Sequence, residues 1–206
     1  MDDSIENLFS TLPVVDPTSE FQDMMSAHEA GHATLGITLG ARIEAVYAIR
    51  NDKPNPTNGK IRLLYQTKFG GPIRAGLHLK DIALFTAGGA AGEFLLNGGK
   101  WDQECVQVDR TQLEERAVWN FSYCAKQAIG LLQENYELLV AVRNKIRSSM
   151  SDLKQCKVAR NGTHIVLVKG SEIERLFHRM GFSVSSATLD LEIAKLREGE
   201  SARSSE

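Results

Sequence analysis

The pattern of apolar and polar residues divides the chain into helical segments and shorter β-rich segments. The first long helix is predicted over residues 17–39. Asp16 can accept hydrogen bonds from the unpaired amides of its first turn, and Pro17 fits that turn because no partner is needed there for its missing N–H. Gly40 is a typical residue just beyond the C-terminal end of a helix. The pattern therefore predicts both ends of this element.

Two pairs of β-rich segments predict two hairpins. Residues 42–49 partly alternate between apolar and polar positions, and residues 61–67 form a second β-rich run after a stretch of turn-forming residues. We expect these strands to form a hairpin with a long loop beside the first helix. Within 156–168, Asn161 and Gly162 separate two further β-rich runs, and both residues accept positive φ. This second hairpin is interpreted as an insertion.

The remaining pattern is mostly helical and predicts a mainly α (α+β) fold with a small sheet. A capping-box pattern at Ser171 and Glu174 opens one short helix, which ends at Gly181. Further helices are predicted over 77–96, over 109–149 with a break near Gly130 or Asn135, and over 186–196.

Length and composition are those of a folded domain. The chain has 206 residues, of which 42% are hydrophobic and 24% are charged. This apolar content is too high for a chain that is disordered throughout. Because no internal repeat or linker divides the sequence, we expect one domain over 16–197, an N-terminal arm over 1–15 and a disordered tail over 198–206.

Charge and cysteine content exclude several classes of protein. The net charge of -2 is too close to neutral for a nucleic-acid binder that depends on phosphate contacts. The acidic N-terminus lacks the positively charged start of a secretory signal, and the most apolar segment, 82–96, is too short to cross a membrane. Cys105, Cys124 and Cys156 have no metal-binding spacing. They indicate free thiols, so we expect a cytoplasmic protein without membrane insertion.

The sequence His28-Glu29-Ala30-Gly31-His32 is the candidate catalytic motif. Within a helix the two histidines lie on one face about one turn apart, where their imidazoles can hold one Zn²⁺ ion at ~2.0–2.1 Å. Glu29 can act as general base, because it can take a proton from zinc-activated water and pass it to a leaving amine. The alternative is an incidental pair of surface histidines, and the capped helical context favours zinc.

Small residues lie within this motif and just after it. Gly31 and Gly36 each cost a helix about 1 kcal/mol relative to alanine, so some compensating contact is expected. A close approach by the backbone of another element would explain them.

A catalytic zinc site needs a third protein ligand and one open position. The extended pattern HExxHxxGxxH would supply that ligand, but Leu35 and Thr38 stand at its glycine and third histidine, which excludes that class. The third ligand must therefore come from elsewhere. Glu93 is either a ligand or an acceptor that orients a histidine N–H. The remaining candidates are His78, His164, His178, Asp102, Glu104 and Asp109.

Several segments in a fixed order carry a family resemblance. They are AHEAGHA at 27–33, AGGAAGEF at 87–94, QVDRTQLEERA at 107–117, and AIGLLQENYELLVAV at 128–142 followed by KGSEIERL at 169–176. In sequence and approximate spacing these segments resemble the FtsH family of zinc metallopeptidases. The resemblance implies a mostly helical zinc-peptidase fold with a small sheet, and it implies that the family's aspartate ligand falls on Asp109.

The chain also departs from this family. Gly88, Gly89 and Glu93 match it, whereas Ala90 and Phe94 replace its arginine and its second glutamate. Family members carry an ATP-driven unfoldase and membrane helices ahead of the peptidase, and this sequence shows neither them nor a GxxxxGK[ST] phosphate loop. We therefore expect activity without ATP, unless a partner ATPase acts in trans.

The sequence thus predicts an ATP-independent zinc metalloendopeptidase that cleaves peptides or unfolded proteins. His28, His32 and Asp109 are expected to bind zinc, with Glu29 as general base. The strand over 61–67 is the best candidate for an exposed sheet edge that binds substrate through main-chain hydrogen bonds. The alternatives are a non-catalytic zinc-binding regulator or adaptor with a peptidase-like fold, and a helical structural protein without metal. Assembly into a homo-oligomer is left open.

Overall fold

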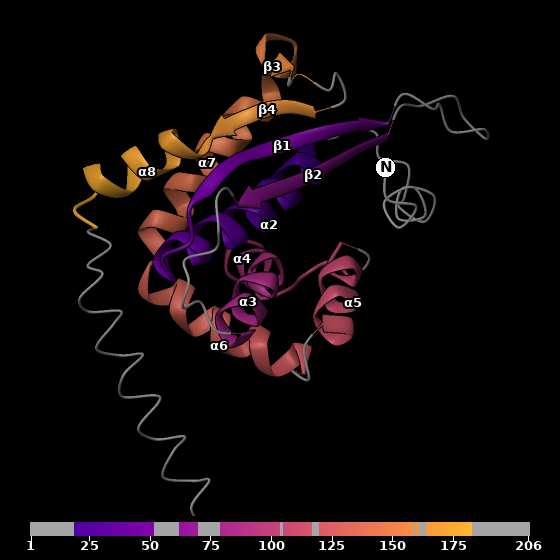
Figure 1. Ribbon diagram of the computed structural model, residues 1–206, viewed down its shortest axis with the longest axis vertical. Helices are drawn as coiled ribbons and strands as arrows, with labels where there is room; N and C mark the ends of the chain where they lie inside the picture. The colour runs from indigo at the N-terminus through magenta and orange to yellow at the C-terminus, as the bar shows by residue number, and fades with distance from the viewer. Residues whose placement is uncertain are drawn as a thin grey trace, which may run out of the picture.

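The computed structural model describes residues 19–51, 62–69, 79–103, 105–116, 120–158, 160 and 164–182. In this part of the chain, helices make up most of the structure and one small antiparallel sheet packs against them (Figure 1). The predicted mainly α (α+β) fold is thereby confirmed. The predicted arm, last helix and tail lie outside the described residues.

The described strands form one sheet, in the order β2-β1-β4-β3, with antiparallel neighbours throughout. Strands β1 (Ile43–Asn51) and β2 (Arg62–Phe69) form the first predicted hairpin, and β2 lies at one edge of this sheet. Strands β3 (Lys157–Val158) and β4 (His164–Lys169) form the second. Because β4 also pairs with β1, the segment interpreted as an insertion is an integral part of the sheet.

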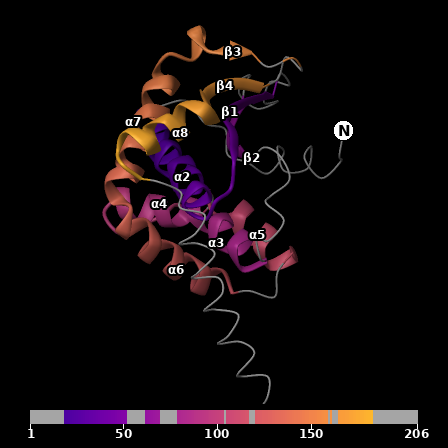
Figure 2. The same ribbon diagram turned by 60° about the vertical axis from the view of Figure 1, so that its left-hand side comes forward.

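Helix α2 (Ser19–Thr38) carries the HExxH motif and lies against one face of the sheet (Figures 1 and 2). Helices α4 and α7 pack on its other sides. This surrounding explains why its small apolar residues do not form a single stripe, and Ala27, Ala30 and Ala33 are all fully buried. The helix is followed by Gly40 with a φ of 83°, which confirms its predicted end.

The second predicted helix is divided at Ala87 into α3 (Leu79–Thr86) and α4 (Gly88–Leu96). In the last turn of α3, the Phe85 carbonyl accepts a hydrogen bond of 2.7 Å from His32 Nδ1. Side-chain bonds to helix carbonyls compete with the regular backbone pattern and bend helices. The division therefore lies where α3 turns one of its carbonyls toward the motif on α2.

The long helical pattern over 109–149 forms several helices rather than one. The predicted break at Asn135 is confirmed, whereas Gly130 lies within a helix. Asn120 caps a further helix start, which the pattern does not predict, by accepting a hydrogen bond from the Tyr123 amide at 3.1 Å. The elements are α5 (Gln107–Arg116), α6 (Phe121–Glu134), α7 (Tyr136–Ser151), the 3₁₀ turn η1 (Leu153–Gln155) and, after β4, α8 (Gly170–Arg179).

The start of α8 differs from the prediction. Ser171 lies inside the first turn rather than at the cap, and the Glu172 carboxylate accepts from the Lys169 amide at 3.4 Å. The helix can begin earlier because β4 leads directly into it. Its predicted end is confirmed by Gly181, which has a φ of 78°.

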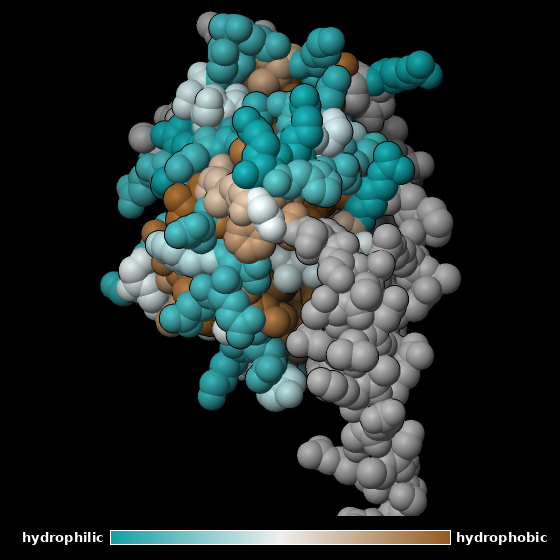
Figure 3. Space-filling view, turned by 90° about the vertical axis from the view of Figure 1, so that its left-hand side faces the viewer, coloured by the Kyte–Doolittle hydropathy of each residue, from teal (hydrophilic) through white to brown (hydrophobic). Residues whose placement is uncertain are grey.

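The hydrophobic core lies between the sheet and the helices, and its residues pack against α2 on several sides. Among the described helices, none combines the length and the apolar character that crossing a membrane requires. On the face shown in Figure 3, hydrophilic residues dominate and hydrophobic ones lie between them in small groups. The large side chains that are fully buried include Leu35, Val46, Leu132, Leu139 and Ile146.

Candidate metal centre

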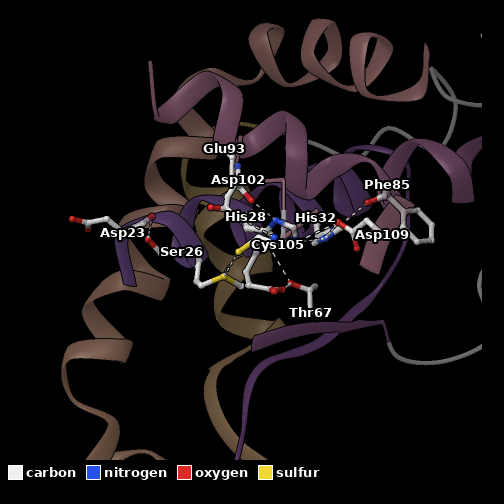
Figure 4. Close-up of polar contacts among 12 residues, drawn as sticks. Asp23, Ser26, His28, His32, Thr67, Phe85, Glu93, Asp102, Cys105 and Asp109 are labelled. Carbon is white, nitrogen blue, oxygen red and sulfur yellow. Dashed lines mark hydrogen bonds and ion pairs between the residues drawn. The ribbon is translucent and has the colours of Figure 1, made fainter. Parts of the chain in front are cut away.

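His28 and His32 lie one turn apart on α2, and their rings meet at a common point (Figure 4). Their Nε2 atoms are 3.1 Å apart, and the ring planes are inclined at 75°. His28 is buried and the His32 side chain is 12% exposed, so bulk water is largely excluded from both rings. The helical spacing of the motif therefore brings the two imidazoles together as predicted.

The other nitrogen of each imidazole is already occupied. His28 Nδ1 donates to Glu93 Oε1 and His32 Nδ1 donates to the Phe85 carbonyl, both at 2.7 Å. A carbonyl oxygen only accepts, so Nδ1 of a neutral His32 must carry the proton, and the Glu93 carboxylate favours the same tautomer of His28. In the neutral state both Nε2 atoms thus present lone pairs to each other. These lone pairs repel each other, and only a cation between them, either a metal ion or a proton, removes the repulsion.

Asp109 brings a negative charge to the same point. It lies in the first turn of α5, and its Oδ2 atom is 3.2 Å from Nε2 of His28 and 3.2 Å from Nε2 of His32. Among the described residues, none makes a regular hydrogen bond to this buried oxygen, and burial without a donor is costly for a carboxylate. The ligand atoms of the three residues all lie within 4.8 Å of one another. Because all are electron-pair donors, His28, His32 and Asp109 could hold a metal ion.

The electrostatics of the cluster favour positive charge at its centre. Burial alone would lower the pKa of His28, but the Asp109 and Glu93 carboxylates hold this pKa well above its ordinary value. The pKa of His32 is also raised, because Asp109 outweighs the effect of burial. Burial would raise the pKa of Asp109, yet the two histidines hold it well below its usual range. Protons and a metal ion therefore compete for the same positions.

Glu93 contacts the back of the His28 ring rather than the point where the ligand atoms meet. It lies on α4, is fully buried, and accepts from His28 Nδ1 through Oε1. Its second oxygen, Oε2, accepts from the Asp102 amide at 2.6 Å. Of the two roles left open by the sequence, this geometry fits the acceptor that orients a histidine.

Glu29 is buried with 2% of its surface exposed. Its carboxylate Oε2 accepts a hydrogen bond of 2.7 Å from Thr67 Oγ1 on β2. The sequence places Thr67 in a predicted strand but does not mark it as a site residue, because a threonine within a strand carries no local signal of contact with a helix. Only the packing of β2 on α2 reveals the pair.

The other candidate ligands do not join the cluster. Asp102 Oδ1 accepts from the Cys105 amide at 2.9 Å and so stabilises the turn before α5. His164 is on β4, with its ring 5.4 Å from that of Tyr47, and His178 is on α8. The two remaining candidates, His78 and Glu104, lie outside the described residues.

Glycines bring α4 close enough to α2 to complete the site. A Cβ atom at Gly31 would overlap the backbone of Gly88 and would lie 3.0 Å from Cα of Gly92. This contact confirms the expected close approach of another backbone to the motif. A Cβ atom at Gly89 would overlap the imidazole of His28, so the ring packs directly on the helix backbone.

Comparisons with known proteins do not add a family assignment. No protein-family model matches the chain, and no curated protein matches it with significant similarity. A functional proposal therefore has to rest on the residues of the metal centre.

Proposed function

We propose that this protein is a zinc metalloendopeptidase that hydrolyses peptide bonds in unfolded proteins or peptides. The observation that carries the proposal is the meeting of His28 Nε2, His32 Nε2 and Asp109 Oδ2 at one buried point of the helix that also carries Glu29. Two imidazoles and one carboxylate form a ligand set of the kind found in catalytic zinc sites. Calcium and magnesium prefer sites made of oxygen ligands, so the histidine pair favours zinc.

Each residue of the site has a part in the proposed reaction. His28, His32 and Asp109 would hold the metal. A bound zinc ion would supply Lewis acidity toward the peptide carbonyl and toward water. Glu29, which follows His28 in the chain, takes a proton from the attacking water and delivers it to the leaving amine. Glu93 and the Phe85 carbonyl keep the two rings in the tautomer whose Nε2 faces the metal.

Strand β2 supports a peptide as substrate. It lies at one edge of the described sheet and packs on α2, which carries Glu29. An edge strand has unpaired backbone groups on one side, and an extended peptide can bind there as an added strand. We propose that an unfolded segment of the substrate binds along β2. Main-chain hydrogen bonds would then bring the substrate backbone to the site, independently of the substrate's side chains.

The resemblance to the FtsH family supports the same assignment of the metal ligands. The family's aspartate ligand would fall on Asp109, and that residue meets the histidines in space. Peptide-bond hydrolysis at this site requires no nucleotide chemistry. We therefore propose that unfolded chains are cleaved without ATP, and that folded proteins resist cleavage unless a partner unfolds them.

The test combines metal analysis with cleavage of casein as an unfolded substrate. Purified protein should contain zinc in a one-to-one ratio with the site, and it should cleave casein without added ATP. Glu29→Gln should keep zinc and lower the cleavage rate by about 100-fold or more, the contribution typical of a general base. Glu20→Gln makes the same chemical change at an exposed position of α2 and should leave the rate unchanged.

Each alternative function gives a different result in this test. A zinc-binding regulator or adaptor would contain zinc but would not cleave casein in either the wild-type or the Glu29→Gln form. A helical structural protein without a metal site would retain no zinc, even after dialysis against a buffer that contains zinc. Undiminished cleavage by Glu29→Gln would disprove the proposed role of Glu29.

A further inference from the structure

Thr67 places a hydroxyl group against the carboxylate of Glu29. It lies on β2 opposite Val46 of β1, and because cross-strand partners share one face of a sheet, Thr67 faces the core side on which Val46 is buried. Helix α2 packs on that side. Figure 4 shows Thr67 on one side of the histidine pair and Glu93 on the other.

The single proton of the Thr67 hydroxyl has two acceptors within reach. Oγ1 lies 2.7 Å from Glu29 Oε2 and 3.2 Å from the Glu29 backbone carbonyl oxygen. The shorter distance is the usual one for an O–H donor, and a hydrogen bond to a carboxylate is about twice as strong as one to a neutral acceptor. The hydroxyl therefore donates to the Glu29 carboxylate.

Burial makes this hydrogen bond important for the orientation of Glu29. The exposed fraction is 9% for Thr67 and 2% for Glu29, so water has little access to the pair. A buried carboxylate needs donors, and within the described part of the chain Thr67 is the side chain that donates to this one. The glutamate side chain has several rotatable bonds, and the hydroxyl holds one of its two carboxylate oxygens toward β2.

We propose that Thr67 is a positioning residue that fixes the Glu29 carboxylate for proton transfer. This inference rests on the proposed function, because it assigns Glu29 as the base. Thr67 acts through Glu29, and it belongs to the strand along which substrate is proposed to bind. In the proposed reaction, the hydroxyl binds Oε2 of Glu29 and the other carboxylate oxygen takes the proton from water.

The test compares substitutions that keep and remove the hydroxyl. Thr67→Val preserves the shape of the side chain without a donor, and Thr67→Ser preserves the donor. Thr67→Val should lower kcat for casein-derived peptides by about 10- to 100-fold, the effect of losing a hydrogen bond to a charged group. KM and zinc content should stay close to the wild-type values, whereas the melting temperature should fall, because the buried carboxylate loses its donor. Thr67→Ser should restore most of kcat.

A control at another threonine separates the hydroxyl effect from a general loss of structure. Thr38 Oγ1 donates to the Thr34 carbonyl at 2.8 Å near the end of α2. Thr38→Val removes a hydroxyl that does not contact Glu29 and should leave kcat unchanged. Thr67→Ala also lacks the donor and replaces Thr67→Val if valine prevents folding at this buried position.

Crystal structures of the Thr67 variants provide a readout that does not depend on activity. In Thr67→Val the Glu29 carboxylate should leave its present position or occupy more than one, and in Thr67→Ser it should stay. An unmoved carboxylate in Thr67→Val, an unchanged kcat, or equal losses in the valine and serine variants would overturn the inference. If the wild type fails to cleave peptides, the proposed function fails, and the carboxylate position alone then decides whether Thr67 orients Glu29.

Discussion

Glu93 accepts a hydrogen bond of 2.7 Å from His28 Nδ1, and both residues are buried. The bond goes to the ring nitrogen opposite the one that faces His32 and Asp109. The other oxygen of Glu93 accepts from the Asp102 amide. With both oxygens engaged behind the ring, this carboxylate is placed to orient His28 and raise its basicity, and not to bind a metal ion held between the two Nε2 atoms.

The two carboxylates of the site should therefore contribute unequally to zinc affinity. Asp109→Ala removes a proposed ligand, whereas Glu93→Ala removes the partner of a proposed ligand, a change that typically costs about 10- to 100-fold in metal affinity. We expect a clearly larger rise of the zinc Kd for Asp109→Ala. Competition with a chromophoric chelator would measure both values.

A matched control for these variants lies on the same helix as Asp109. Glu114 is exposed on α5, and Glu114→Ala should leave the zinc Kd unchanged. Equal losses in Asp109→Ala and Glu93→Ala, or a larger loss in Glu93→Ala, would mean that the two roles are assigned wrongly.

The sequence predicts the part of the site that depends on local geometry. His28 and His32 are one helical turn apart, so the helix alone brings their rings together. Asp109 follows from family resemblance, because nothing local to α5 indicates that it approaches α2. The contact between Glu29 and Thr67 joins a helix to a strand across the core, and the hydrophobic pattern of neither element specifies it.

The elements of the fold follow the sequence pattern except where side chains act on the backbone. The ends of α2 and α8 are marked by Gly40 and Gly181, whose positive φ values suit glycine. The break at Ala87 and the cap at Asn120 depend on hydrogen bonds that periodicity does not report. Prediction from sequence therefore works best where glycine or helical spacing determines the structure alone.

Zinc binding should release protons and should weaken as the pH falls. The pKa values of His28 and His32 are raised in the folded protein, so a fraction of the Nε2 atoms is protonated near neutral pH and the metal must displace these protons. Calorimetry at about pH 7 in buffers of different ionisation enthalpy would detect the release. His178→Gln on the exposed side of α8 should not alter it.

The same pKa shifts predict how pH affects the metal-free protein. A raised histidine pKa adds stability that is fully present below the ordinary value of 6.5 and is lost as the pH rises through the folded value. The lowered pKa of Asp109 adds stability that is present above 3.8 and is lost only at lower pH. Zinc should therefore raise the melting temperature more at about pH 8 than at about pH 6. An equal rise at both values would contradict the proposed competition.

Gly31 lies where the backbone of α2 approaches that of α4 closely. A Cβ atom there would overlap the Gly88 carbonyl, and two packed backbones cannot yield as a side chain can. Gly31→Ala should lower the free energy of unfolding by about 1–3 kcal/mol, although alanine favours a helix by about 1 kcal/mol. Denaturant unfolding of the metal-free protein measures this change.

Gly130 provides the matched control for that substitution. It lies in α6, and a Cβ atom there would meet nothing within 4 Å. Gly130→Ala should raise the free energy of unfolding by up to about 1 kcal/mol, because only helix propensity changes. Two substitutions of the same kind should thus have opposite signs, and a neutral Gly31→Ala would show that the helices can separate without cost.

Gly89 should affect metal binding more than folding. A Cβ atom at this position would overlap the ring of His28, which can rotate away, whereas the backbone at Gly31 cannot. Rotation of the ring would break its hydrogen bond to Glu93 and move Nε2 away from Asp109. Gly89→Ala should therefore raise the zinc Kd by about 10- to 100-fold or more. It should change the unfolding free energy of the metal-free protein less than Gly31→Ala does.

The two measurements on Gly89→Ala separate its role as a platform for His28 from a role in helix packing. Zinc competition reports the position of the ring, and denaturant unfolding without metal reports the contact between α2 and α4. If the variant binds zinc like the wild type but loses as much stability as Gly31→Ala, then Gly89 serves the packing of α4. If zinc affinity falls while stability is retained, Gly89 is required because a side chain there would displace the imidazole of His28.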